Sequence, residues 1–175
     1  VLEREPRNQE ARVALVDVAI AERDYARAHA VLVEGAFFHP NDLRMTMAEA
    51  RLTRARGDQA RTLRLMENAA ARRLQELRAD GELAQVTAAQ AAMAPGSRAT
   101  QATRLTDPLT AQIAEELIRA RDEAAVWLQT GVQIQNRTGV AGLSRMTNVT
   151  APIDVSAPMP GIGGRVTVGV DMVTL

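Results

Sequence analysis

Residues 6–39, PRNQEARVALVDVAIAERDYARAHAVLVEGAFFH, are followed directly by residues 40–73, PNDLRMTMAEARLTRARGDQARTLRLMENAAARR. The two stretches carry one pattern at an offset of 34 residues (40 − 6). Equivalent positions hold similar residues in four pairs: Pro6 and Pro40, Asn8 and Asp42, Asp24 and Asp58, Gly35 and Ala69. A fixed period of this length is typical of stacked helical hairpins. The sequence therefore predicts four antiparallel helices in two hairpins over residues 8–77.

The predicted helices have recognisable starts. Asn8 and Asp24 can each cap a helix, because a side-chain oxygen at this position accepts a hydrogen bond from the first turn. The expected helices cover about 8–22, 24–39, 43–56 and 59–77. The fourth is longer than the period predicts and has no proline at its end, which indicates the last repeat of an array.

The paired stretches resemble the tetratricopeptide repeat, in which antiparallel helix pairs stack into a superhelix. The resemblance rests on apolar and small residues at matching positions, namely Leu15-Val16, Ala19, Ala28, Leu32, Gly35, Ala50, Met66 and Ala69. Arg12, Thr46 and Thr62 depart from the pattern, the first two at positions where the family often has a large apolar residue. An ordinary pair of helical hairpins with chance spacing is the alternative.

Changes in composition divide the chain into four parts. The expected parts are tetratricopeptide repeats over 1–78, a linker with a weak helix over 79–106, an amphipathic connecting helix over 107–128, and a β-rich segment over 129–175. The weak helix covers 82–93, before Pro95-Gly96-Ser97. The fold class expected is mainly α: a solenoid of helical hairpins, then a linker helix and a short β-rich C-terminal segment.

The connecting helix has a clear start at Asp107-Pro108, a cap followed by a first-turn proline. Its expected buried face is Leu109, Ile113, Leu117, Ala120, Ala124 and Trp127. After Trp127 the hydrophobic period changes from that of a helix to that of a strand. Alternation predicts strands at 132–135, 146–150 and 165–175, with turns at 139–142 and 158–164.

Composition and motifs argue against several functions. The formal net charge is zero and the four aromatic residues are not interleaved with a basic stripe, so we expect no nucleic-acid binding. Residues 137–144 look like a phosphate loop but lack the lysine that such a loop requires, and the chain has no lysine. His29 and His39 have no acid cluster at ligand spacing, and there is no cysteine. We therefore expect no metal, no cofactor and no enzymatic activity.

The order of the motifs is similar to that of the bacterial cellulose synthase operon protein C family. After the repeats come the Asp107-Pro108-Leu109 helix, Arg137-Thr-Gly139, Gly142-Leu-Ser144, Pro152 and the strand that begins Gly163-Gly164-Arg165. The resemblance implies a periplasmic repeat solenoid joined to an outer-membrane β-barrel that exports a polysaccharide, with this sequence spanning the junction. It implies as partners the other subunits of a synthase and export complex and a β-glucan chain. A repeat protein with an unrelated β appendage is the alternative.

Further expectations concern the ends of the chain and its last strand. Val1 and Leu175 are expected to be cuts within a longer protein, because the sequence does not begin with methionine and its last strand lacks a partner. In the barrel that the resemblance implies, Val166, Val168, Val170 and Met172 are expected to face lipid and Thr167, Gly169 and Asp171 the lumen. In the present chain this strand is expected to be loosely held or paired only with residues 130–150. A soluble adaptor that binds a peptide in a concave groove is the second function to weigh, and an enzyme is the third.

A candidate binding face comprises Arg44, Arg51 and Arg54 on the third predicted helix. The family resemblance places that helix on the concave side of the solenoid. Such a face could hold an acidic peptide or the carboxylates of a partner, and a solvated helix surface is the alternative.

Overall fold

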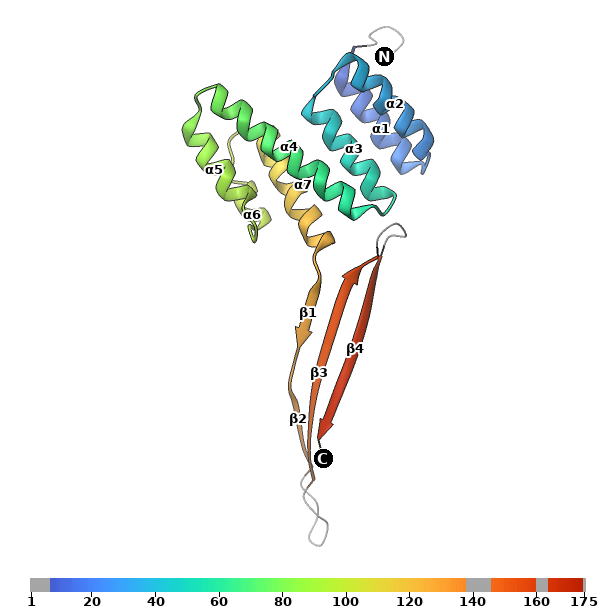
Figure 1. Ribbon diagram of the computed structural model, residues 1–175, viewed down its shortest axis with the longest axis vertical. Coiled ribbons are helices and arrows are strands. Elements are labelled where there is room, and N and C mark those ends of the chain that lie inside the picture. The colour runs from blue at the N-terminus through green and yellow to red at the C-terminus, as the bar shows by residue number, and fades with distance from the viewer. Residues whose placement is uncertain (1–6, 138–145, 160–163, 175) are drawn as a thin grey trace. The chain divides into compact units, whose positions relative to one another are not determined.

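The computed structural model describes residues 7–137, 146–159 and 164–174, and over these residues the chain is mainly helical with a small antiparallel sheet (Figure 1). A helical unit extends to Ala124, and a sheet unit begins at Ala125. The expected turn at 139–142 lies outside the described residues, as do residues 160–163 of the turn expected at 158–164.

The predicted four helices over 8–77 are confirmed. They are α1 (Gln9–Ala21), α2 (Tyr25–Phe38), α3 (Leu43–Ala55) and α4 (Gln59–Ala79). The side chains of Asn8, Asp24, Asp42 and Asp58 each accept a hydrogen bond from the first-turn backbone, at 2.7–3.1 Å. Each cap therefore offsets part of the free-energy cost of the first-turn backbone N–H groups, which have no hydrogen-bond partner within the helix.

The first core lies between α1, α2 and α3. It contains Val16, Ala19, Ala28, Val31, Leu32, Met45, Ala48 and Leu52. Gly35 of α2 is part of this contact, because a Cβ there would lie 2.2 Å from Met45 Cε and 2.8 Å from Arg12 Cδ. The absence of a side chain at Gly35 therefore sets how closely α2 approaches α1 and α3.

Arg12 is buried in this region, with 1% of its surface exposed. Its Nη1 lies 3.0 Å from Glu34 Oε2, and its guanidinium stands over the Phe38 ring at 5.2 Å. The hydrogen bond and the positive charge of Arg12 hold the pKa of Glu34 below its usual value. The buried guanidinium of Arg12 is tolerated because a carboxylate and an aromatic ring compensate its charge.

The second core joins α3 to the later helices. It includes Met47, Ala50, Met66, Ala69, Leu77, Ile113 and Leu117. Thr62, a departure from the family pattern, is fully buried here, with its hydroxyl 2.9 Å from that of Thr53 and donating to Asp58 O. Because α3 contributes to both cores, it is packed on two sides.

The weak helix expected at 82–93 is confirmed as α5 (Leu83–Met93), and the short α6 (Ala99–Ala102) follows it. Val86, Ala89, Ala92, Met93 and Ala102 are buried in the second core. The prediction missed this packing because small alanine side chains give a weak hydrophobic period although they allow helices to approach closely.

Helix α7 (Pro108–Ala124) ends before the expected boundary at 128. Ile113, Leu117 and Ala120 are buried as predicted, and Ala124 and Leu109 are only partly buried. The prediction that Trp127 lies on the buried face of this helix is wrong, because Trp127 starts a strand and is 54% exposed.

The sheet is organised around one long strand. The strands are β1 (Trp127–Thr130), β2 (Gln133–Arg137), β3 (Met146–Pro158) and β4 (Arg165–Thr174). β3 pairs antiparallel with β4 along one edge and with β1 and β2, in succession, along the other (Figure 1). The sheet is therefore three strands wide, with β1 and β2 forming one interrupted edge strand.

Two expectations about the strands need correction. β3 continues through Pro152 to Pro158 rather than ending near residue 150. β4 pairs with residues 149–158 rather than with 130–150. The carbonyl of Pro152 accepts from Gly131 N at 3.1 Å, so the edge of Pro152 that lacks an N–H faces the break between β1 and β2. The interruption of the edge strand is what accommodates the proline.

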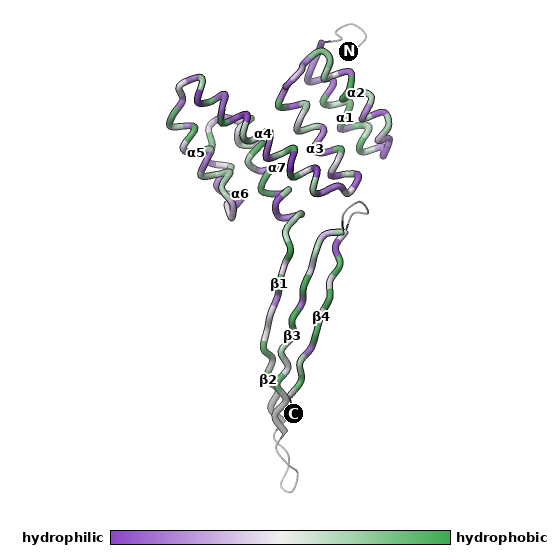
Figure 2. The backbone as a smooth tube through the Cα atoms, in the orientation of Figure 1, coloured by the Kyte–Doolittle hydropathy of each residue, from purple (hydrophilic) through white to green (hydrophobic). Residues whose placement is uncertain are grey.

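The two faces of the sheet differ in polarity. Residues in register on one face are apolar, including Leu128, Ala151, Ile153, Val155, Val166, Val168, Val170 and Met172. The other face carries Gln129, Thr150, Asp154, Ser156, Thr167 and Asp171. Figure 2 shows that hydrophobic and hydrophilic residues follow one another along β3 and β4. Among the described residues, most of the larger apolar side chains in the sheet are exposed.

Candidate functional site

The helical unit contains a groove lined by residues of α1, α3 and α7. Two adjoining hollows of about 540 and 370 Å³ form it and share Asp17 and Gln112. Val13, Ala14, Pro108, Leu109 and Met47 supply its apolar surface. Volumes of this size are within the roughly 300–1,000 Å³ typical of binding pockets. The groove is the candidate interaction site of the helical unit.

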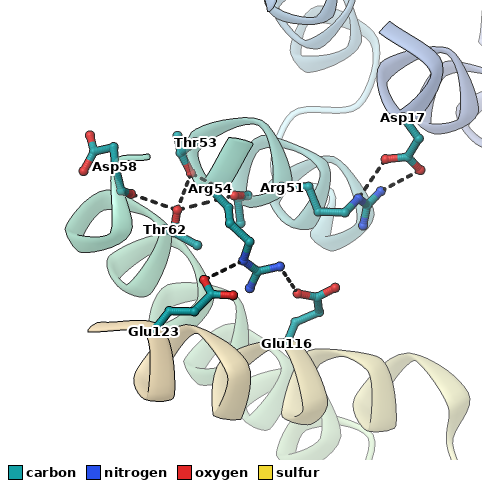
Figure 3. Close-up of polar contacts among 9 residues, drawn as sticks. Asp17, Arg51, Thr53, Arg54, Asp58, Thr62, Glu116 and Glu123 are labelled. Atoms are coloured by element: carbon teal, nitrogen blue, oxygen red, sulfur yellow. Dashed lines mark hydrogen bonds and ion pairs between the residues drawn. The ribbon is translucent and has the colours of Figure 1, made fainter. Parts of the chain in front are cut away.

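Two of the candidate arginines lie at this groove. Arg44 Nη1 lies 3.2 Å from Glu10 Oε1. Arg51 holds Asp17 with two hydrogen bonds, Nε to Oδ1 at 2.8 Å and Nη2 to Oδ2 at 3.1 Å (Figure 3). Each arginine is 34 residues after its acid. The pairs therefore join equivalent positions of the two hairpins, and bidentate geometry makes the second pair the stronger one.

Arg54 has a different role. Its Nη1 lies 2.6 Å from Glu116 Oε2 and its Nε 2.9 Å from Glu123 Oε2, both on α7 (Figure 3). It is not among the residues that line the groove. The structure thus places Arg44 and Arg51 at the groove and uses Arg54 to hold α7 against α3.

The charge of the groove is the reverse of what the arginines alone suggest. Its lining residues include five acids, Glu10, Asp17, Asp107, Glu115 and Glu116, and two bases, Arg44 and Arg51. Four of these acids pair with an arginine: Glu10 with Arg44, Asp17 with Arg51, Glu116 with Arg54 and Asp107 with Arg73. The lining therefore keeps a small excess of negative charge, at Glu115, which favours a positively charged ligand. The expected attraction for an acidic peptide stays a prediction, and each of its three arginines already contacts an acid. The sequence could not reveal this, because three of the acids come from α7 or its cap.

Asp107 anchors the start of α7 to α4. Its Oδ2 accepts from Thr110 N at 2.8 Å and lies 3.0 Å from Arg73 Nη2. Partial burial acts to raise the pKa of Asp107, but the hydrogen bonds from Thr110 and the charge of Arg73 outweigh it and lower that pKa. For Arg73, burial acts to lower the pKa, but the hydrogen bonds that it donates to Glu76 and Asp107 raise the pKa.

We expect Asp107 to make stability depend on acidity. Its folded pKa lies below the ordinary value of 3.8, so its stabilisation is complete above that value and is lost as the pH falls through the folded pKa. Urea unfolding of the parent and of Asp107→Asn should differ at about pH 6 and converge toward about pH 3. A difference that stays constant over this range would contradict the assignment.

Some other features are absent from the part of the chain that the structure describes. None of its helices is long and apolar enough to cross a membrane. Within residues 7–137, 146–159 and 164–174, no group of three His, Asp or Glu side chains is placed to hold a metal ion.

Comparison with known proteins gave no match among family models, curated proteins or solved structures.

Proposed function

We propose that this chain belongs to a non-catalytic export component for an exopolysaccharide, with cellulose as the glycan. In this proposal the helical unit is the end of a tetratricopeptide-type periplasmic solenoid, and the sheet unit is the start of an outer-membrane β-barrel. The observation that carries the proposal is the two-faced sheet that follows the helical hairpins, with a charge-free apolar face and a polar face.

The repeat geometry supports the solenoid part. Helices α1 and α3 have the same length of 13 residues, and their caps Asn8 and Asp42 are 34 residues apart. The turns repeat as well, since Arg23 and Gly57 both have left-handed φ angles, of 60° and 81°. A recurrence of caps, turns and the length of the first helix is what a stacked repeat requires, because each repeat must present the same surfaces to its neighbours.

The sheet supports the barrel part. Val166, Val168 and Val170 of β4 share a face with Ile153 and Val155 of β3. An outer-membrane strand needs such a lipid-facing row alternating with polar residues that face the lumen. A bilayer also requires that every strand edge be paired. In a closed barrel the edge of β4 that is opposite β3 must therefore pair with a further strand.

Thiol labelling tests the barrel. The chain has no cysteine. Single cysteines can therefore be placed at Thr167 and at Val168, two adjacent residues on opposite faces of β4, and compared in outer membranes. We expect a water-soluble maleimide to label the Thr167 position quickly and the Val168 position slowly, because lipid excludes the reagent. A cysteine at the exposed Glu67 of α4 is the accessible control. Equal and rapid labelling at both strand positions would show that β4 is not in a bilayer.

A second candidate function is a soluble adaptor that binds a protein segment in its groove. The observation that favours it is the groove between α1, α3 and α7. The same groove would serve the export component in binding other subunits of its complex. Under either function, the excess of acids in the lining favours a segment rich in arginine or lysine.

Peptide titration tests the groove. Three fluorescent peptides of equal length, which differ only in carrying arginine, glutamine or glutamate at alternate positions, are added to the full chain. We expect the arginine peptide to bind most tightly and to weaken with salt, because its attraction is electrostatic. Glu115→Arg should weaken this binding, and Glu67→Arg, outside the groove, should not. Tighter binding of the glutamate peptide would contradict the charge assignment.

A further inference from the structure

The register of the sheet places the one tryptophan of the chain on the polar face. Trp127 is opposite Ser156, and Ser156 is opposite Thr167 across β3 and β4. Leu128, the next residue, is opposite Val155 and belongs to the apolar face. Because side chains alternate between faces along a strand, Trp127 cannot share the face of Leu128 and the valines of β4.

This position is unusual for a large aromatic side chain. In a membrane barrel, aromatic residues at the ends of strands usually form girdles on the lipid-facing side. Trp127 is on the opposite side, and half of its surface is exposed. Neither a contact with lipid nor packing in a core accounts for the position of Trp127. A large, rigid, amphipathic ring that remains exposed among polar groups is suited to contact a ligand.

Polar side chains surround this position. The next row of the same face contains Gln129 and Asp154. Ser156 Oγ accepts from Arg165 Nε at 3.1 Å and lies 3.3 Å from Thr167 Oγ1. This surface therefore combines one flat apolar ring with hydroxyl, amide and carboxylate groups that can donate or accept hydrogen bonds.

Gly169 leaves room for the side chain of Asp154. It is opposite Asp154, and a Cβ at Gly169 would lie 2.5 Å from Asp154 Oδ1. The carboxylate of Asp154 thus lies over the backbone of β4, in the space that the Cβ of any other residue at position 169 would occupy. A long ligand that lies along this face would therefore meet the Asp154 carboxylate at Gly169, where it offers a hydrogen-bond acceptor.

We propose that the polar face of the sheet is a contact surface for an uncharged glycan, with Trp127 as the platform on which a pyranose ring stacks. A pyranose ring has an apolar face of C–H groups and a rim of hydroxyls, which match the indole and the hydrogen-bonding groups of Gln129, Asp154 and Ser156. Asp154 and Asp171 outnumber Arg165 on this face, so an anionic glycan is disfavoured, because like charges repel. This inference rests on the proposed export of a glucan and adds the residues that contact it.

Intrinsic fluorescence gives a direct test, because Trp127 is the one tryptophan in the sequence. The full chain is titrated with cellohexaose and, separately, with hexagalacturonate, its anionic counterpart. We expect cellohexaose to quench or shift the emission in a saturable manner and hexagalacturonate to leave it unchanged. An unchanged emission with cellohexaose, or an equal response to both, would overturn the proposal.

Variants on the two faces of the sheet give a second test, in which calorimetry measures their affinity for cellohexaose. Trp127→Ala should weaken binding by roughly two- to tenfold, the range for loss of one aromatic contact. Trp127→Phe, which keeps a smaller ring, should weaken it less. Leu128→Ala, on the apolar face, is the matched control and should bind like the parent. Equal losses for Trp127→Ala and Leu128→Ala would overturn the proposal, because they would indicate a general effect on the sheet.

The outcome can be separated from that of the proposed function. If the β4 cysteines label as expected for a bilayer while no oligosaccharide binds, the glycan surface is wrong and the membrane role stands. If cellohexaose binds at Trp127 while both β4 cysteines label equally, the glycan surface stands on a sheet that is outside a bilayer.

Discussion

Replacing Ala69 with glutamate is expected to destabilise the helical unit by about 2 kcal/mol or more, because it buries a charge without a partner. Ala69 is fully buried in the second core, where α4 meets α3 and α7. It is also the equivalent of Gly35, which permits close approach in the first hairpin. Urea unfolding followed by far-ultraviolet circular dichroism measures the effect.

The neighbouring residue supplies the control for this change. Asn68 is exposed on the same helix, so Asn68→Glu adds the same charge without burying it. We expect its unfolding midpoint to stay close to that of the parent. An Ala69→Glu protein that unfolds like Asn68→Glu would show that Ala69 is not at a close helix contact.

Replacing Arg54 with glutamate is expected to weaken the attachment of α7 by about 3 kcal/mol, because breaking a mostly buried charge pair leaves its partners uncompensated. Arg54 is 20% exposed and contacts both Glu116 and Glu123. The variant brings three carboxylates together at this place. Chemical unfolding measures the loss, and limited proteolysis reports whether α7 becomes accessible.

A charge reversal on the partner helix provides the complementary test. Glu116→Arg combined with Arg54→Glu should recover part of the lost stability, because the pair is restored with opposite polarity. Arg64→Glu, at an exposed position of α4, is the matched control. The assignment fails if the double variant is no more stable than Arg54→Glu alone.

The first four helices could be predicted because their signals are local. A cap such as Asn8 acts on Ala11, three residues away, and the 34-residue offset repeats the same local signal. The start of α7 was visible for the same reason, since Asp107 caps its own first turn. Helix bounds from such signals were accurate to within a few residues.

The rest depends on contacts that are distant in sequence. Arg54 meets its carboxylates 62 and 69 residues later, and Arg12 meets Glu34 on another helix. No local pattern assigns these partners, so an arginine face that looked free in the sequence is largely neutralised in the structure. Alternation predicts a strand only at 146–150, whereas β3 continues through Pro152. The break between β1 and β2 that accommodates this proline depends on tertiary pairing, which no local pattern reveals.

The double-sided packing of α3 has a consequence for how the helical unit opens. In a simple repeat array, each interface contributes separately, and an end hairpin can detach at modest cost. Here Met45 and Leu52 of α3 belong to one core and Met47 and Ala50 to the other. Removing α3 therefore disrupts both cores at once. Slow amide hydrogen exchange in α1 and in α7 should be governed by one shared cooperative opening of the whole unit.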